Sequence, residues 1–176
     1  MTEEKEGASA PLFELYRLDG EMTCDEVIAA LAAMPARLRA IAGRLDASAL
    51  ARRARDGEWS AIEVCRHVRD VVQVYGMRFK WMILNDDPFL PNYDEDRWVS
   101  EHPDGVTEID AMLREIEAYR GETVRLLRAL APEGWSRRGR HEVLGSVELE
   151  AYVRHELAHE LGHVEQLRVA VSARAG

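Results

Sequence analysis

Four histidines are the residues of this chain whose type and spacing best suit metal binding. His155, His159 and His163 follow one another at intervals of four residues, and residues four apart lie on one face of a helix. Two imidazoles placed in this way can bind one divalent cation, as helical histidine pairs do in known metal sites. The alternative is a set of surface or capped histidines, because a pair at this spacing is common by chance.

The fourth histidine, His67, lies inside a separate apolar segment. The row from His155 to His163 spans about 12 Å of helix axis, which is too far for all three rings to reach one ion. The sequence therefore leaves open which pair binds. His67 is either a core residue with one hydrogen bond or, if its helix packs beside the row at about 8–10 Å between axes, the source of a third nitrogen. Cys65 lies about 200° around the helix from His67, so we expect a small buried residue there instead.

Four segments have the apolar spacing of three and four residues that predicts amphipathic helices. They cover about 24–45, 60–84, 107–130 and 147–172. A residue suited to capping precedes or opens each segment, namely Thr23, Ser60, Thr107 and Ser146. The stretch 85–105 is expected to be an irregular crossover loop, and no strand pair is evident. The pattern predicts an all-α four-helix bundle with one long loop, a fold whose core often holds metal sites.

Length and charge narrow the class of protein. The 176 residues fit a single domain, expected over 12–172 after a disordered tail at 1–11. The net charge of −9 argues against a nucleic acid partner, because phosphate binding needs clustered cations. No apolar run approaches the roughly 20 residues of a membrane span, and no secretory leader is evident. We expect a cytoplasmic protein whose two cysteines stay reduced.

Acidic side chains near the histidines are expected to orient the imidazoles. The candidates are Glu63, Glu156 and Glu160. Glu63 also suits the capping box of Ser60, and this use is the favoured one. Glu160 lies about 100° from His159 around the helix, so it can face another helix or solvent instead.

Two further groups have two interpretations each. The loop at 85–105 is either a cover over the metal or a plain surface crossover, and its candidate side chains are Tyr93, Arg97 and Trp98. The arginines 137, 138 and 140 either receive an anionic substrate or form an ordinary solvated basic run.

Two motifs resemble the signatures of the DinB/YfiT-like superfamily. Residues 59–68, WSAIEVCRHV, resemble the pattern W-S-x-x-E-[IV]-x-x-H-[LV]. Residues 159–167, HELGHVEQL, resemble H-[DE]-x-x-H-x-x-Q-[IL]. The resemblance extends over about 12–172, and the two motifs at this separation are more specific together than either is alone.

The resemblance implies a four-helix bundle, often a homodimer, with one divalent metal ion bound by His67, His159 and His163. His155 falls outside this triad. Zinc and nickel are the expected ions. Three neutral ligands leave at least one open position, where a water is acidified or a thiol is deprotonated.

Members of the superfamily include transferases that use low-molecular-weight thiols and a thiol-dependent isomerase. We therefore expect this chain to activate such a thiol for transfer to a small electrophilic substrate, or for isomerisation. The alternative is a non-catalytic, metal-binding or dimerising, stress-related bundle.

Overall fold

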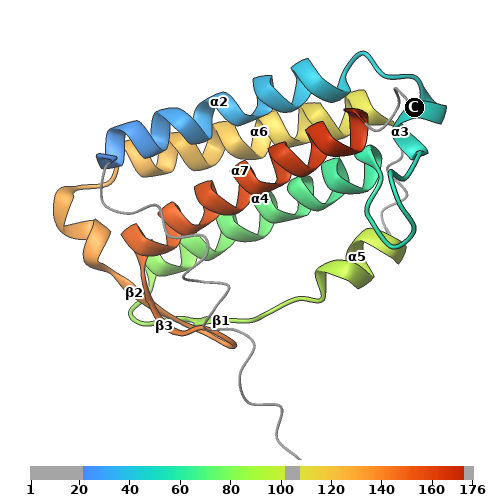
Figure 1. Ribbon diagram of the computed structural model, residues 1–176. Helices are drawn as coiled ribbons and strands as arrows, with labels where there is room; N and C mark the ends of the chain where they lie inside the picture. The colour runs from blue at the N-terminus through green and yellow to red at the C-terminus, as the bar shows by residue number, and fades with distance from the viewer. Residues whose placement is uncertain (1–21, 102–107, 173–176) are drawn as a thin grey trace, which may run out of the picture.

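A computed structural model describes residues 22–101 and 108–172 of the chain. Its long helices are α2 (Cys24–Ala42), α4 (Ala61–Leu84), α6 (Ile109–Arg128) and α7 (Leu149–Ser172). They run side by side as a four-helix bundle, which confirms the predicted architecture (Figure 1). The predicted tail at 1–11 and the Thr107 cap lie outside the described residues, and the domain limits 12–172 stay a prediction.

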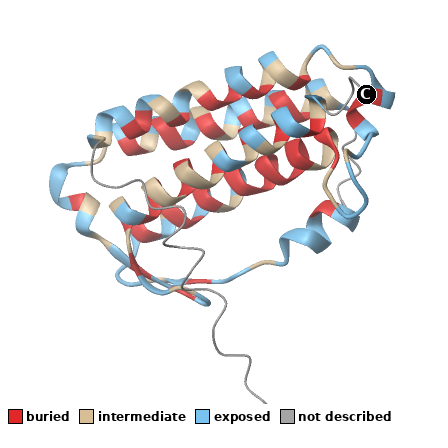
Figure 2. Ribbon diagram, in the orientation of Figure 1, coloured by how far each residue is buried: buried red, intermediate tan, exposed pale blue. Residues whose placement is uncertain are grey.

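The helices pack in a ring in which α2 and α4 lie diagonally opposite each other. Each of these two helices contacts both α6 and α7. Their inward faces are buried along the whole bundle (Figure 2). Leu31, Leu38 and Phe79 are among the fully buried side chains, and each such burial stabilises the fold by about 1.5–3 kcal/mol. The packing of α4 against α7 brings the two histidine-bearing helices together.

Polar side chains fix where two of these helices begin. Thr23 and Glu26 form the predicted capping box at the start of α2. Ser60 and Glu63 form the second one at the start of α4. Glu63 is therefore used as a cap, as favoured from the sequence. Helix α2 ends at Ala42, three residues earlier than predicted, where Gly43 becomes the C-cap.

The connections contain more regular structure than the sequence indicated. The predicted polar link after α2 holds α3 (Ala47–Ala51), and the predicted irregular loop holds β1 (Phe89–Leu90) and α5 (Glu95–Glu101). A short 3-10 helix, η1 (Pro132–Ser136), follows α6. Figure 1 shows α5 and the strands along one long side of the bundle, beyond α4.

The expectation that the chain has no strand pair is wrong. β2 (Arg138–His141) and β3 (Gly145–Glu148) form an antiparallel hairpin, and β1 adds to β2 in parallel. These strands have two to four residues each, which is too short for an alternating pattern to stand out. Ser146 lies in β3 and pairs with Arg140, so it does not cap a helix. The last helix consequently starts at Leu149.

Within residues 22–101 and 108–172, no helix combines the length and the apolar composition that crossing a bilayer requires.

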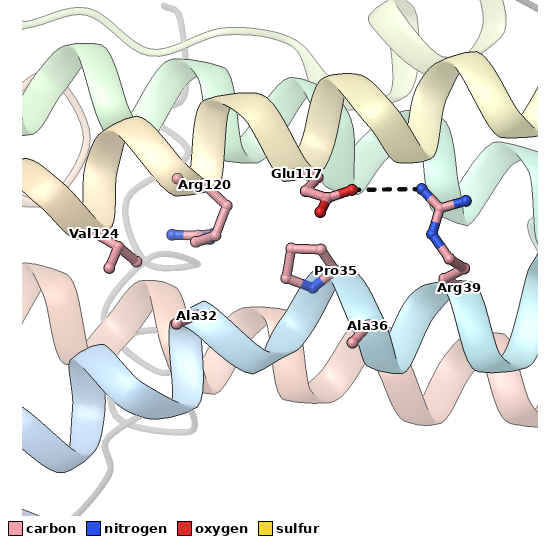
Figure 3. A pocket seen from close by; sticks show the side chains of 8 residues that line it. Ala32, Pro35, Ala36, Arg39, Glu117, Arg120 and Val124 are labelled. Carbon is pink, nitrogen blue, oxygen red and sulfur yellow. Dashed lines mark ion pairs between the residues drawn. The ribbon is translucent and has the colours of Figure 1, made fainter.

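A buried ion cluster links α6 to α7 in the middle of the bundle. Arg120 is 1 % exposed and donates from Nη2 to Glu156 Oε1 at 2.9 Å and to Glu160 Oε1. Both glutamates are also buried, and burial raises the pKa of each carboxyl group. Arg120 also lines a groove of about 360 Å³ between α2 and α6. Glu117 and Arg39 form an ion pair in this groove (Figure 3). In the buried cluster, the guanidinium of Arg120 thus pairs with two carboxyl groups, those of Glu156 and Glu160.

We expect Arg120→Met to lower the free energy of unfolding by about 3–5 kcal/mol, because it leaves two buried carboxyl groups without their cation. Urea denaturation at neutral pH measures the change. Arg128→Met is the matched control, since Arg128 lies on the same helix and is exposed. An equal, small effect of both substitutions would contradict a structural role for the buried cluster.

Candidate metal centre

The structure brings His67, His159 and His163 together and leaves His155 outside the group. His67 comes from α4 and the other two come from α7. One ligand atom from each of the three lies within 4.8 Å of the others. The ring of His67 lies 4.3 Å from that of His163 and 5.3 Å from that of His159, between centroids. The arrangement matches the triad that the family resemblance implied.

Helix geometry explains why this pair on α7 meets His67. His159 and His163 are one turn apart, and their Nε2 atoms approach to 3.0 Å. His155 is one turn further from His163, and its ring stacks at 6.3 Å from that of His159. It continues the row toward Tyr152, whose ring lies 6.1 Å away.

Burial keeps the three imidazoles uncharged. It lowers the pKa of His67 to about 3, with a further contribution from His163. It lowers the pKa of His159 to about 2, with added effects of the neighbouring histidines, and it also lowers that of His163. Neutral imidazole is the form that ligates a metal. The site therefore offers lone pairs at neutral pH without first losing protons.

Gln166 sets the orientation of His163. Its Oε1 lies 2.8 Å from His163 Nδ1, and an amide oxygen can only accept, so Nδ1 carries the hydrogen. The lone pair of His163 is then on Nε2, which faces the triad. A hydrogen bond to the far nitrogen is the usual way in which ligating histidines are held. The sequence placed Gln166 in a motif but did not assign it this role.

The triad fits a divalent cation. His67 is 1 % exposed, and within the described part of the chain neither of its ring nitrogens has a hydrogen-bond partner. Burying an imidazole without a partner costs free energy, and a cation at Nε2 would offset part of this cost. Imidazole ligands suit zinc, nickel, copper and iron alike. Cys65 is buried in the core with a pKa raised to about 12 by desolvation, as expected for a packing residue.

The acidic residues proposed to orient the imidazoles have other partners. Glu63 forms the cap of α4 and an ion pair with Arg53. Glu156 and Glu160 point to Arg120, because they lie about 100° around α7 from the preceding histidines.

The basic run beside the hairpin serves the local structure. Arg137 donates to the carbonyl oxygens of Met82 and Asn85, and Arg138 pairs with Glu148 across the hairpin. Arg140 pairs with Asp87. The run therefore has local structural contacts, a use that neither sequence interpretation named.

Glu95 is the acidic residue that the sequence reasoning missed. It is the first residue of α5, and its Oε2 lies 3.9 Å from His67 Nε2. Its side chain is 53 % exposed. Burial, followed by Asp96 and Asp94, raises its pKa. The sequence signal that could have identified Glu95 is the short helix at 95–101. The several acidic residues of this stretch favoured an irregular loop instead.

Trp59 packs against the rings of His67 and His163. Its ring lies 4.9 Å from that of His67 and stacks at 6.1 Å on that of His163. An indole in this place excludes water from the side chains that it covers.

The depressed pKa of His155 predicts a pH effect on stability. Burial lowers this pKa from 6.5 to about 4. Between these values the unfolded chain binds more protons than the folded one, so the free energy of unfolding falls as the pH falls from about 6.5 to about 4. Glutamine does not titrate, so we expect a smaller loss in His155→Gln than in the wild type.

The measurement is urea denaturation of metal-free protein at about pH 7 and about pH 5. The raised pKa values of Glu156 and Glu160 act in the opposite sense, but they act in both proteins and cancel in the comparison. An identical pH dependence of the two proteins would contradict a buried, neutral His155.

Comparison with known proteins identifies the family of this chain. The model of the DinB superfamily matches residues 30–167. Two proteins of Oceanobacillus iheyensis, each named "Putative metal-dependent hydrolase", are similar to this chain. One is 29 % identical over 154 residues, covering 82 % of this chain and 89 % of the relative. The other is 22 % identical over 140 residues, covering 80 % of each.

Two solved structures share the fold. YfiT from Bacillus subtilis, described as "a probable metal-dependent hydrolase with an unusual four-helix bundle topology", superposes with a TM-score of 0.79 at 22 % identity, over 90 % of this chain and 97 % of YfiT. The four-helix bundle protein TT2238 gives a TM-score of 0.57 at 20 % identity, over 83 % and 98 %. At these identities the likeness shows the fold. Since the family model spans both histidine-bearing helices, the chain belongs to the DinB superfamily.

Proposed function

We propose that this protein is a metal-dependent enzyme in which His67, His159 and His163 hold one divalent cation, with zinc or nickel as the expected ion. The observation that carries the proposal is the convergence of three neutral imidazoles within 4.8 Å, from two helices that the bundle holds together. A cation bound by three neutral ligands supplies a Lewis acid that lowers the pKa of a protic molecule in its open position.

The residues around the triad would orient the imidazoles and limit the access of solvent to the cation. Gln166 holds His163 with its Nε2 lone pair toward the triad. Trp59 shields two of the rings. Low solvent access strengthens electrostatic interactions in the site. These features support a pre-formed centre whose ligands need little rearrangement.

Two nucleophiles are consistent with this centre. The names of the Oceanobacillus relatives support water and thus hydrolysis. The two sequence motifs support a low-molecular-weight thiol and its transfer to a small electrophilic substrate, or a thiol-dependent isomerisation. A homodimer in the cytoplasm is part of the same proposal and rests on the family resemblance and composition.

Metal content tests the centre itself. We expect close to one divalent ion per chain by elemental mass spectrometry of untagged wild-type protein, and almost none in His159→Ala, because two remaining imidazoles hold an ion far more weakly. His155→Ala is the matched control, since it removes a histidine of the same helix one turn from the triad, and it should keep its metal. Retention of the ion by His159→Ala, or loss from both variants alike, would contradict the assignment.

Turnover separates the two nucleophiles. Metal-loaded protein is incubated with a panel of activated esters and alkyl halides, with and without a thiol such as bacillithiol or glutathione. Consumption that requires the thiol indicates transfer, and ester cleavage without it indicates hydrolysis. In either case we expect His163→Ala to reduce the rate to background. A fully loaded wild type without any turnover on the panel would favour the non-catalytic, metal-binding alternative.

A further inference from the structure

The carboxylate of Glu95 approaches the triad from α5. This residue lies outside the bundle, on the segment that crosses from α4 to α6. Its Oε2 is 3.9 Å from Nε2 of His67, the same nitrogen that has no hydrogen-bond partner in the described part of the chain. Because Glu95 is half exposed while His67 is buried, the carboxylate lies between the triad and solvent.

The crossover segment is held in place on both sides of Glu95. Before it, Arg78 of α4 donates to the carbonyl oxygen of Pro91. After it, Arg66 of α4 donates from Nη1 to the carbonyl oxygen of Val99 at 3.1 Å, and Val99 is 2 % exposed. These contacts fix the backbone that carries Glu95, so its approach to His67 does not depend on a free loop.

Asp94 contributes a third anchor by capping α5. Its Oδ1 accepts from the backbone N–H of Arg97 at 3.0 Å, which defines the start of the helix. Glu95 follows the cap directly, and its side chain is therefore directed by helical rather than loop geometry. The carboxylate of Asp94 is used as the helix cap, whereas the carboxylate of Glu95 lies beside His67 of the triad.

The distance favours an outer position for Glu95 over a place as a fourth ligand. Although Oε2 of Glu95 lies 3.9 Å from Nε2 of His67, Glu95 does not belong to the group whose ligand atoms all lie within 4.8 Å of one another. A carboxylate at this range is suited to accept a hydrogen bond from a molecule bound beside the histidines.

We infer that Glu95 is the residue that contacts the nucleophile in the open position of the metal centre, accepting a hydrogen bond from its O–H or S–H group. This inference rests on the proposed metal centre. A protic ligand gains a charge-assisted hydrogen bond from the carboxylate. An anion that carries no hydrogen meets only repulsion from it. The residue would thus select neutral protic molecules over anions.

Azide binding tests this role without any turnover. Full-length protein is loaded with one equivalent of Co²⁺, and azide is titrated at one fixed pH while the d–d absorption is recorded. Wild type is compared with Glu95→Gln, which removes the charge and keeps the shape, and with Asp96→Asn, which makes the same charge change at an exposed neighbouring residue. We expect azide to bind Glu95→Gln at least about fivefold more tightly than wild type, and Asp96→Asn within about twofold, because the repulsion is short-range.

Each contrary result has a distinct meaning. Equal azide affinity in wild type and Glu95→Gln, or an equal shift in both variants, would overturn the contact while the metal centre stands. Loss of Co²⁺ binding in Glu95→Gln at least about a hundredfold would overturn the outer position, since Glu95 would then be a ligand. Failure of wild-type protein to bind Co²⁺ at all would overturn both this inference and the proposed function.

Discussion

The packing of three uncharged imidazoles at one point between α4 and α7, with His67 buried and the other two partly buried, is the constraint on which this site depends. Desolvation holds the pKa values of His67 and His159 far below neutrality, so both imidazoles are uncharged. Among the described residues neither ring nitrogen of His67 has a hydrogen-bond partner, and burying an imidazole in this state costs free energy. In the proposed function a divalent cation at His67 Nε2 would offset part of this cost, and the clustering of the three histidines supports that proposal.

The rest of the bundle can be understood as the means of holding α7 in register with α4. Successive residues of α7 face different helices. Each histidine of the row faces α4, whereas Glu156 and Glu160, which follow His155 and His159, face Arg120 of α6. A shift of α7 by one residue that brings Glu160 to the place of His159 would put carboxylates where the imidazoles lie. The buried ion cluster, whose net stability contribution can be small, is thus suited to specify the position of the metal ligands.

The long helices were predictable because their apolar spacing is repetitive, and the family resemblance named the three histidines that the structure brings together. Periodic apolar residues and the boxes at Thr23 and Ser60 located α2 and α4, and the family motifs selected His163 over His155. The hairpin was missed because strands of four residues give almost no pattern. Glu95 and Gln166 were missed for another reason: their roles follow from contacts with residues elsewhere in the fold, and acidic or amide side chains are ordinary in loops and on helix surfaces. Only the packing of α5 against α4 makes Glu95 distinctive.

The most direct test of the metal centre is X-ray absorption spectroscopy at the K-edge of the bound metal in zinc- or nickel-loaded protein. The structure predicts, for zinc, a first shell of nitrogen scatterers at about 2.0–2.1 Å with the multiple-scattering pattern of three imidazoles. For protein kept free of added thiol, the spectrum would contradict the account if it showed a shell of sulfur at about 2.3 Å or of oxygen alone, in either case without imidazole scattering, because such a shell would place the ion away from His67, His159 and His163.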